Sequence, residues 1–205
     1  MDWGREPNIY VIGGAEGVGL ALVKEILNRG AIMVGVLDGT GTDPKAVDAL
    51  DGVWMVQHDL SFSCPDLFAG STVFHTAYSH LDDPLDRLQS NMRMGLNIIR
   101  ALTAACKLRR PPRLAVYIPP EQIDLTTRLS VGWLFKCLNR IYGVPVLGVA
   151  VKGLTDSVVA DVVCDLAGSD CTRYGPHVVI EPGGENVIHH HAGAYSERAA
   201  AKLAQ

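Results

Sequence analysis

The sequence predicts a doubly wound α/β fold, in which helices cover both faces of a seven-stranded parallel sheet. Seven short runs are almost wholly apolar, as in residues 9–12 and 144–151. A strand with apolar side chains on both faces must be covered on both faces, which is typical of parallel sheets. Segments with helical apolar spacing separate most of these runs, and this alternation indicates consecutive β-α-β units.

The boundaries of the expected elements follow from the turn residues between them. The expected strands comprise residues 9–12, 32–37, 53–57, 71–77, 113–118, 144–151 and 177–180. The expected helices comprise residues 18–27, 45–50, 84–108, 121–142 and 155–167. Gly30 follows the first helix, in a position where glycine commonly ends a helix. We expect one domain over residues 1–184 and a C-terminal extension over residues 185–205.

Composition and charge argue against several classes of function. The 205 residues carry a net charge of −4 with acids and bases interspersed, so no nucleic-acid partner is expected. No apolar stretch approaches the roughly 20 residues of a membrane span. The N-terminus lacks an apolar signal core, so a cytoplasmic protein without a membrane anchor is expected. The five cysteines form no Cys-x-x-Cys pair, which favours reduced thiols over disulfides or a zinc site.

Three adjacent histidines, His189, His190 and His191, form the one candidate metal site. Neighbouring residues of an extended chain point to opposite faces, so only the first and third could converge. No cluster of carboxylates or cysteines accompanies them in the sequence. We therefore expect no metal, and we interpret the extension that carries them as part of a subunit interface.

A glycine-rich turn, Gly13-Gly14-Ala15-Glu16-Gly17-Val18-Gly19, follows the first apolar run. In such a turn Gly13 allows a tight reversal, Gly17 lets the backbone approach a pyrophosphate, and Gly19 lets helix and strand pack closely. The helix that begins near Val18 would direct backbone N–H groups and its positive dipole end towards a phosphate. The turn therefore predicts a dinucleotide site.

Asp38 ends the second apolar run, where its carboxylate could accept a hydrogen bond from a ribose 2′-hydroxyl and would repel a 2′-phosphate. NAD is therefore predicted in preference to NADP. One residue opposes binding of the cofactor, because Glu16 places a negative charge beside the expected pyrophosphate.

With its Gly-x-x-x-Gly-x-Gly spacing the chain resembles the short-chain dehydrogenase/reductase (SDR) family, whose fold is Rossmann-like. The resemblance spans residues 9–184 and includes segments 73–77, 91–95 and 178–184. Asp59-Leu60 resembles the acidic site after the third strand that contacts adenine in the family. The resemblance thus implies cofactor-binding roles for Gly13, Gly17, Val18, Gly19, Asp38, Asp59 and Leu60.

The catalytic apparatus that this resemblance implies is missing. The family uses a Tyr and a Lys four residues later on one helix, and the sequence contains no Tyr-x-x-x-Lys. Gly132 stands four residues before Lys136, where the Tyr would be needed. The fifth strand runs into Pro119-Pro120 with no room for the loop that carries the family's Ser. Tyr117, Tyr78 and His75 remain as weak candidates for a displaced acid or base, although each could equally be a packed side chain.

We therefore favour a catalytically inactive SDR-like subunit that assembles with an active NAD-dependent dehydrogenase. Heteromeric members of the family, such as one acting on a hydroxybenzylsuccinyl-CoA, pair an active with an inactive subunit. The helices over 84–108 and 121–142 resemble the family's dimer helices, and apolar residues surround the second one, so an oligomer is expected through them. The alternatives are an oxidoreductase, cyclase or isomerase with a displaced acid or base, and an NAD(H)-binding regulator.

Overall fold

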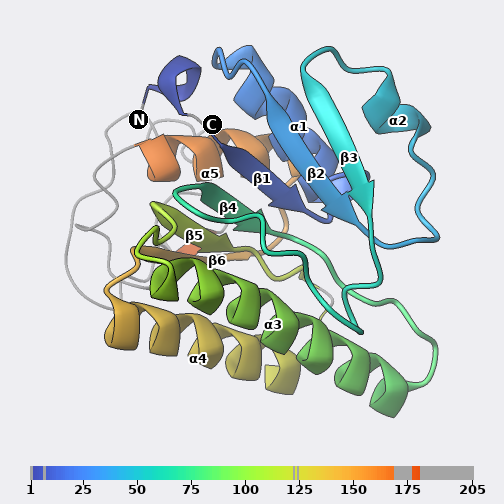
Figure 1. The fold of residues 1–205 in the computed structure, drawn as a ribbon. Helices are drawn as coiled ribbons and strands as arrows, with labels where there is room; N and C mark the ends of the chain where they lie inside the picture. The colour runs from blue at the N-terminus through green and yellow to red at the C-terminus, as the bar shows by residue number, and fades with distance from the viewer. Residues whose placement is uncertain (1, 7, 122, 124, 169–176, 181–205) are drawn as a thin grey trace.

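A computed structural model describes residues 2–6, 8–121, 123, 125–168 and 177–180 (Figure 1). Its seven parallel strands form one sheet in the order β3-β2-β1-β4-β5-β6-β7. The strands are β1 (Ile9–Ile12), β2 (Val34–Asp38), β3 (Val53–Gln57), β4 (Thr72–His75), β5 (Leu114–Tyr117), β6 (Val146–Val151) and β7 (His177–Ile180). The predicted doubly wound, seven-stranded Rossmann-like sheet is confirmed. The histidines at 189–191 and the extension 185–205 lie outside the described residues.

Helices cover both faces of this sheet, as predicted (Figure 1). The helices are α1 (Gly17–Asn28), α2 (Lys45–Asp48), α3 (Pro84–Lys107), α4 (Leu125–Tyr142) and α5 (Asp156–Gly168). α1 packs beside α5 on one face, and α3 packs beside α4 on the other. No helix within the described residues is long and apolar enough to cross a membrane.

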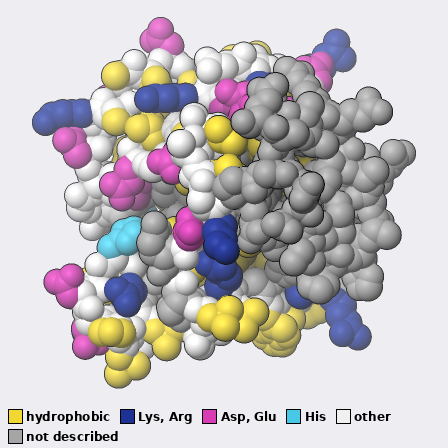
Figure 2. All heavy atoms as spheres, turned by 180° about the vertical axis from the view of Figure 1, so that it is seen from behind, with side chains coloured by type: hydrophobic (Ala, Val, Ile, Leu, Met, Phe, Trp, Pro, Cys, Tyr) yellow, Lys and Arg dark blue, Asp and Glu magenta, His cyan; other side chains and the backbone are white. Residues whose placement is uncertain are grey.

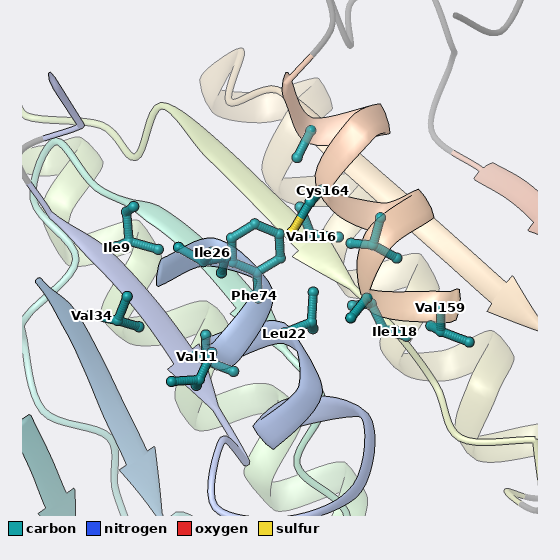
Figure 3. Close-up of a cluster of buried hydrophobic side chains, with 14 of the residues drawn as sticks. Ile9, Val11, Leu22, Ile26, Val34, Phe74, Val116, Ile118, Val159 and Cys164 are labelled. Atoms are coloured by element: carbon teal, nitrogen blue, oxygen red, sulfur yellow. The ribbon is translucent and has the colours of Figure 1, made fainter. Parts of the chain in front are cut away.

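Alternation along each strand divides the core into two layers. Ile9 and Val11 of β1 face α1 and α5, whereas Tyr10 and Ile12 face α3 and α4. Figure 3 shows the first layer, with Phe74 of β4 close to side chains of α1. Both sets of side chains are almost completely buried, which is why every position of β1 is apolar.

Local sequence explains where α3 begins, whereas α4 begins later than its local sequence predicts. Asp83 caps α3 by accepting hydrogen bonds from the backbone N–H groups of Leu85 and Asp86, and Pro84 occupies the first turn. The fourth helix, expected from residue 121, begins only at Leu125. Before it the chain makes a turn, in which the backbone N–H of Ile123 donates to the carbonyl of Pro120, and Glu121 bonds outside the helix.

Candidate functional site

A cleft of about 990 Å³ lies at the carboxyl edge of the sheet. Its walls come from the ends of the strands β1 to β6 and from the first residues of α1 and α5. The strand order reverses between β1 and β4. From β1 the chain adds β2 and β3 towards one edge of the sheet, and then β4 to β7 towards the other edge. Ligands of doubly wound folds bind in the crevice at such a switch point.

The glycine turn is shaped first by packing. Gly13 has a φ of +83°, and a Cβ there would lie 2.5 Å from the backbone N of Ala77. A Cβ on Gly19 would lie 1.8 Å from the carbonyl O of Gly13. The hydroxyl of Thr76, which the sequence analysis did not single out, donates to the carbonyl oxygens of Ile12 and Gly13 at 3.0 Å. These contacts would require two of the three motif glycines with or without a cofactor.

Gly17 differs from the other two glycines because it borders the open cleft. Its φ is +51°, and the only atom near a Cβ there would be Oδ2 of Asp156, at 3.9 Å. Gly17, Val18 and Gly19 form the first turn of α1 and line the cleft, so their N–H groups lie where an anion could bind. Two carboxylates, Glu16 and Asp156, line the same part of the cleft. Glu16 could be identified from the sequence, but Asp156 could not, because it lies 140 positions further along the chain.

The structure places Asp38 where a ribose hydroxyl could reach it. Its carboxylate lines the cleft and already accepts three hydrogen bonds, from the N–H groups of Ala15 (3.0 Å) and Gly39 (2.8 Å) and from the hydroxyl of Thr42 (3.1 Å). A carboxylate offers about four acceptor positions. One therefore remains, which suffices for one sugar hydroxyl.

Asp59 and Leu60 also line the cleft, on the loop after β3. One oxygen of Asp59 accepts hydrogen bonds from the hydroxyl and the backbone N–H of Ser61, and these bonds lower the pKa of the carboxyl. The amide of Asn97 on α3 donates to the carbonyls of Leu60 and Ser61 and so fixes the loop. The loop thus presents a carboxylate and an apolar side chain, a combination that suits a base with an amino group.

Two of the three candidate acid–base residues lie in the core and not at the cleft. His75 and Tyr117 are each 2% exposed and pack against Phe135, with ring centroids 6.1 Å and 5.3 Å away. Burial lowers the pKa of His75 to about 3, so its ring is neutral at physiological pH. Neither residue is among those that line the cleft. Strand alternation directs both side chains under α4, so the structure does not favour His75 or Tyr117 as an acid or base.

Tyr78 is the third candidate, and it does line the cleft. Its hydroxyl is buried, and burial followed by the neighbouring Tyr117 raises the pKa of Tyr78 well above its usual range. A catalytic tyrosine needs the opposite shift, because it must exchange a proton near neutral pH. The structure therefore does not favour Tyr78 as a proton donor or acceptor.

The side of the cleft beyond β4 offers little chemistry. Besides Tyr78, its walls include the loop residues Ser79, His80 and Leu81, residues 118–120 and Val151. No residue among those described in α4 lines the cleft. Gly132 is buried within that helix, and Lys136 points outward to solvent. Glu121 accepts a hydrogen bond from the backbone N–H of Gly153 (2.9 Å), which ties the β5–α4 turn to the β6–α5 loop.

The cleft thus fits the adenosine of NAD but does not fit its pyrophosphate. Asp38, Asp59 and Leu60 could hold an adenosine, but four carboxylates and no Lys or Arg stand among the described lining residues. Two of these carboxylates flank the position that a pyrophosphate would need. The described residues contain no group of three or more His, Cys, Asp or Glu that could hold a metal ion.

Comparison with known proteins identifies the fold. No protein-family model matches the chain, and neither does any curated protein. Among solved structures, the Bordetella bronchiseptica enzyme WbmF in complex with NAD+ and UDP aligns at 19% identity and a TM-score of 0.59, over 74% of this chain. The alignment covers 51% of WbmF, so the chain spans about half its length.

Two further solved structures align over more of the chain. One, from Corynebacterium glutamicum and assigned to the short-chain dehydrogenase/reductases, aligns over 85% of this chain and 99% of its own, with 19% identity and a TM-score of 0.65. The UDP-N-acetylglucosamine 4-epimerase of Methanobrevibacter ruminantium in complex with UDP-N-acetylmuramic acid aligns over 90% of this chain and 78% of its own, with 13% identity and a TM-score of 0.67. The chain therefore has the Rossmann-like α/β fold that these proteins share.

Proposed function

We propose that this chain is an SDR-like subunit that performs no hydride transfer itself and assembles with an active NAD-dependent dehydrogenase. One observation carries the proposal. The cleft keeps a ribose-binding and a base-binding end, whereas the described lining residues beyond β4 supply no Tyr and Lys in reach of each other. A reductase active site needs such a pair to deliver a proton while hydride is transferred.

The outer face of α3 and α4 supports the second half of the proposal. Leu125, Leu129 and Trp133 follow one another at helical spacing on the outer side of α4 and are 63–66% exposed. Leu85 on α3 is 61% exposed. Figure 2 shows hydrophobic and basic side chains along the lower edge of the molecule, where these two helices lie. Exposed apolar stripes of this kind mark interaction surfaces.

Charge on this face favours a different chain over a second copy. The segment 87–143 holds ten of the 18 Lys and Arg residues but only two of the 22 acidic residues. The prediction of evenly interspersed acids and bases is therefore wrong for this segment. Arg93, Arg100, Lys136 and Arg140 are exposed, and none has a salt bridge within the described residues. In a two-fold dimer through α3 and α4 this positive surface would meet itself, whereas an acidic and apolar partner would complement it.

Co-purification from the native cell tests the proposal. We expect the tagged chain to bring down a dehydrogenase, and the double substitution Lys136→Glu and Arg140→Glu to lose it. Lys45→Glu makes the same type of charge change at an exposed site remote from α3 and α4, and should retain the partner. A chain that is a stable monomer in native mass measurements and recovers no dehydrogenase would refute the assembly.

Turnover assays test the proposal that the chain performs no hydride transfer. The purified chain should neither reduce NAD+ nor oxidise NADH with any carbonyl or alcohol substrate of the partner. The alternative, an enzyme with a displaced acid, would have to use Tyr78, because it alone of the three candidates lines the cleft among the described residues. Turnover by the chain alone that is lost in Tyr78→Phe would establish that alternative.

A further inference from the structure

We infer that the cleft selects a nucleoside whose 5′ position is uncharged or cationic, and that it disfavours the pyrophosphate of a dinucleotide. The inference rests on the nucleoside-binding part of the proposed function and defines its ligand class. It does not depend on the partner subunit. The two ends of the cleft suit a ribose and a base, whereas the middle of the cleft is negatively charged.

The ribose end offers one open acceptor on a nearly buried carboxylate. Asp38 is 9% exposed, and three internal donors orient both of its oxygens. The donors fix the carboxylate in place, so little side-chain entropy is lost when a sugar hydroxyl binds to the remaining acceptor position. A 2′-phosphate at this point would face the carboxylate directly.

The base end offers an acceptor beside an apolar wall. The Oδ1 atom of Asp59 accepts both hydrogen bonds from Ser61, which leaves Oδ2 for an exocyclic amino group. Leu60 and Met94 line the same part of the cleft and are buried against the α3 layer. A flat base with an amino group, such as adenine, matches this pairing of one acceptor and an apolar surface.

The middle of the cleft, where a 5′ substituent would lie, carries negative charge. Glu16 immediately precedes α1, and Asp156 begins α5. Asp156 Oδ2 lies 3.9 Å from the position of a Cβ on Gly17, at the opening turn of α1. Both residues therefore put negative charge beside the helix N-terminus at which a phosphate would bind.

No cation in the described lining offsets these charges, since His80 is the only basic side chain there. Glu16 and Asp156 are both exposed, so water and salt screen their charges in part, but like charges at close range still repel. A phosphate at the α1 N-terminus would be repelled by the carboxylates of Glu16 and Asp156. An amino or sulfonium group there would instead be attracted, and a hydroxyl would be tolerated.

A series of ligands that differ only at the 5′ carbon tests the inference. Isothermal titration of the full chain with 5′-amino-5′-deoxyadenosine, adenosine, AMP and NADH should give affinities that fall in that order. We expect at least a tenfold loss from adenosine to AMP. Raising the salt concentration should strengthen AMP binding, because it screens a repulsion.

Two variants separate charge from shape. Glu16→Gln combined with Asp156→Asn should raise the NADH affinity at least tenfold and leave adenosine within about twofold. Asp51→Asn removes an exposed acid outside the cleft and should change neither affinity. Thermal melts of each variant establish that it is folded.

The other possible outcomes distinguish failure of the selectivity from failure of the proposed function. If NADH or AMP binds unaltered protein as tightly as adenosine, the selectivity is wrong while the proposed nucleotide-binding subunit survives. If the double variant leaves the NADH affinity unchanged, the electrostatic reasoning is wrong. If no member of the series binds saturably, both the inference and the nucleoside-binding part of the proposed function fail. Loss of the partner in co-purification, with the selectivity intact, would refute only the assembly.

Discussion

Replacement of His75 by Phe should make the stability of the protein less sensitive to acid. The ring of His75 is buried among Tyr78, Tyr117 and Phe135, and its Nδ1 atom has no hydrogen-bond partner among the described residues. Burial lowers the pKa of His75 from 6.5 to about 3. In the unfolded chain the ring has its ordinary pKa, so between these two values the unfolded state binds one more proton than the folded state.

The sign and size of the effect follow from this difference. Because the unfolded state takes up the proton, the free energy of unfolding falls as pH drops below about 6.5, by about 1.4 kcal/mol per pH unit. At pH 5 the cost from this residue alone reaches about 2 kcal/mol, and it has the same size for any folded-state pKa below about 4. At pH 7.5 the cost is absent, and Phe should be as stable as His or more stable, because it removes an unpaired buried nitrogen.

Urea denaturation of both proteins at pH 7.5, 6.5, 5.5 and 5.0 measures the effect. Other groups titrate equally in the two proteins, so the difference between them isolates His75. His80→Gln, at an exposed site, is the matched control and should follow the unaltered protein at every pH. A constant difference between the unaltered protein and His75→Phe across this range would refute the buried neutral histidine.

Two further predictions concern packing. Arg29→Gln should lower the free energy of unfolding by about 2–3 kcal/mol in urea denaturation, because Arg29 joins Glu25 to Asp161 and Asp165 across α1 and α5, and Asp165 is only 8% exposed. Arg5→Gln, which breaks an exposed pair with Asp2, should leave the denaturation midpoint unchanged, and an equal loss in both variants would contradict the role of burial. Gly19→Ala should prevent folding or displace the glycine turn, whereas Gly17→Ala should cost only about 1–2 kcal/mol from its positive φ, as compared by circular dichroism melts. Equal melting temperatures for the two alanine variants would show that the turn does not pack as described.

The strands could be predicted from the sequence because each is apolar on both faces and ends in a turn. β1, β3 and β7 begin and end at the predicted residues. The start of α4 could not be predicted, because Glu121 bonds to Gly153, a residue 32 positions away. The short 3₁₀ turn at Trp3–Arg5 was not predicted either. In this turn Trp3 stacks on Phe74, with the two ring centroids 6.3 Å apart. Local propensity contains no information about such contacts.

At the candidate site, the sequence identified the residues next to the glycine turn and at strand ends. Gly13, Gly17, Val18, Gly19, Asp38, Asp59 and Leu60 all line one cleft. Asp156 and Asn97 were missed because they reach the site through the winding of the sheet and not through any motif. His75 and Tyr117 were plausible as catalytic residues only until the alternation of β4 and β5 placed them on the covered face.

The glycine motif can be retained in a sequence even when the ligand that it predicts is not bound. Gly13 and Gly19 are required by contacts with Ala77 and with each other, and these contacts exist whatever the cleft binds. A substitution at either position would disrupt the first β-α-β unit, so selection for folding alone would keep both glycines. The residues that are free to change are those that line the open cleft, such as Glu16 and Asp156, where charge has little effect on the core. Their carboxylates, and not the glycines, therefore carry the information about what this cleft can bind.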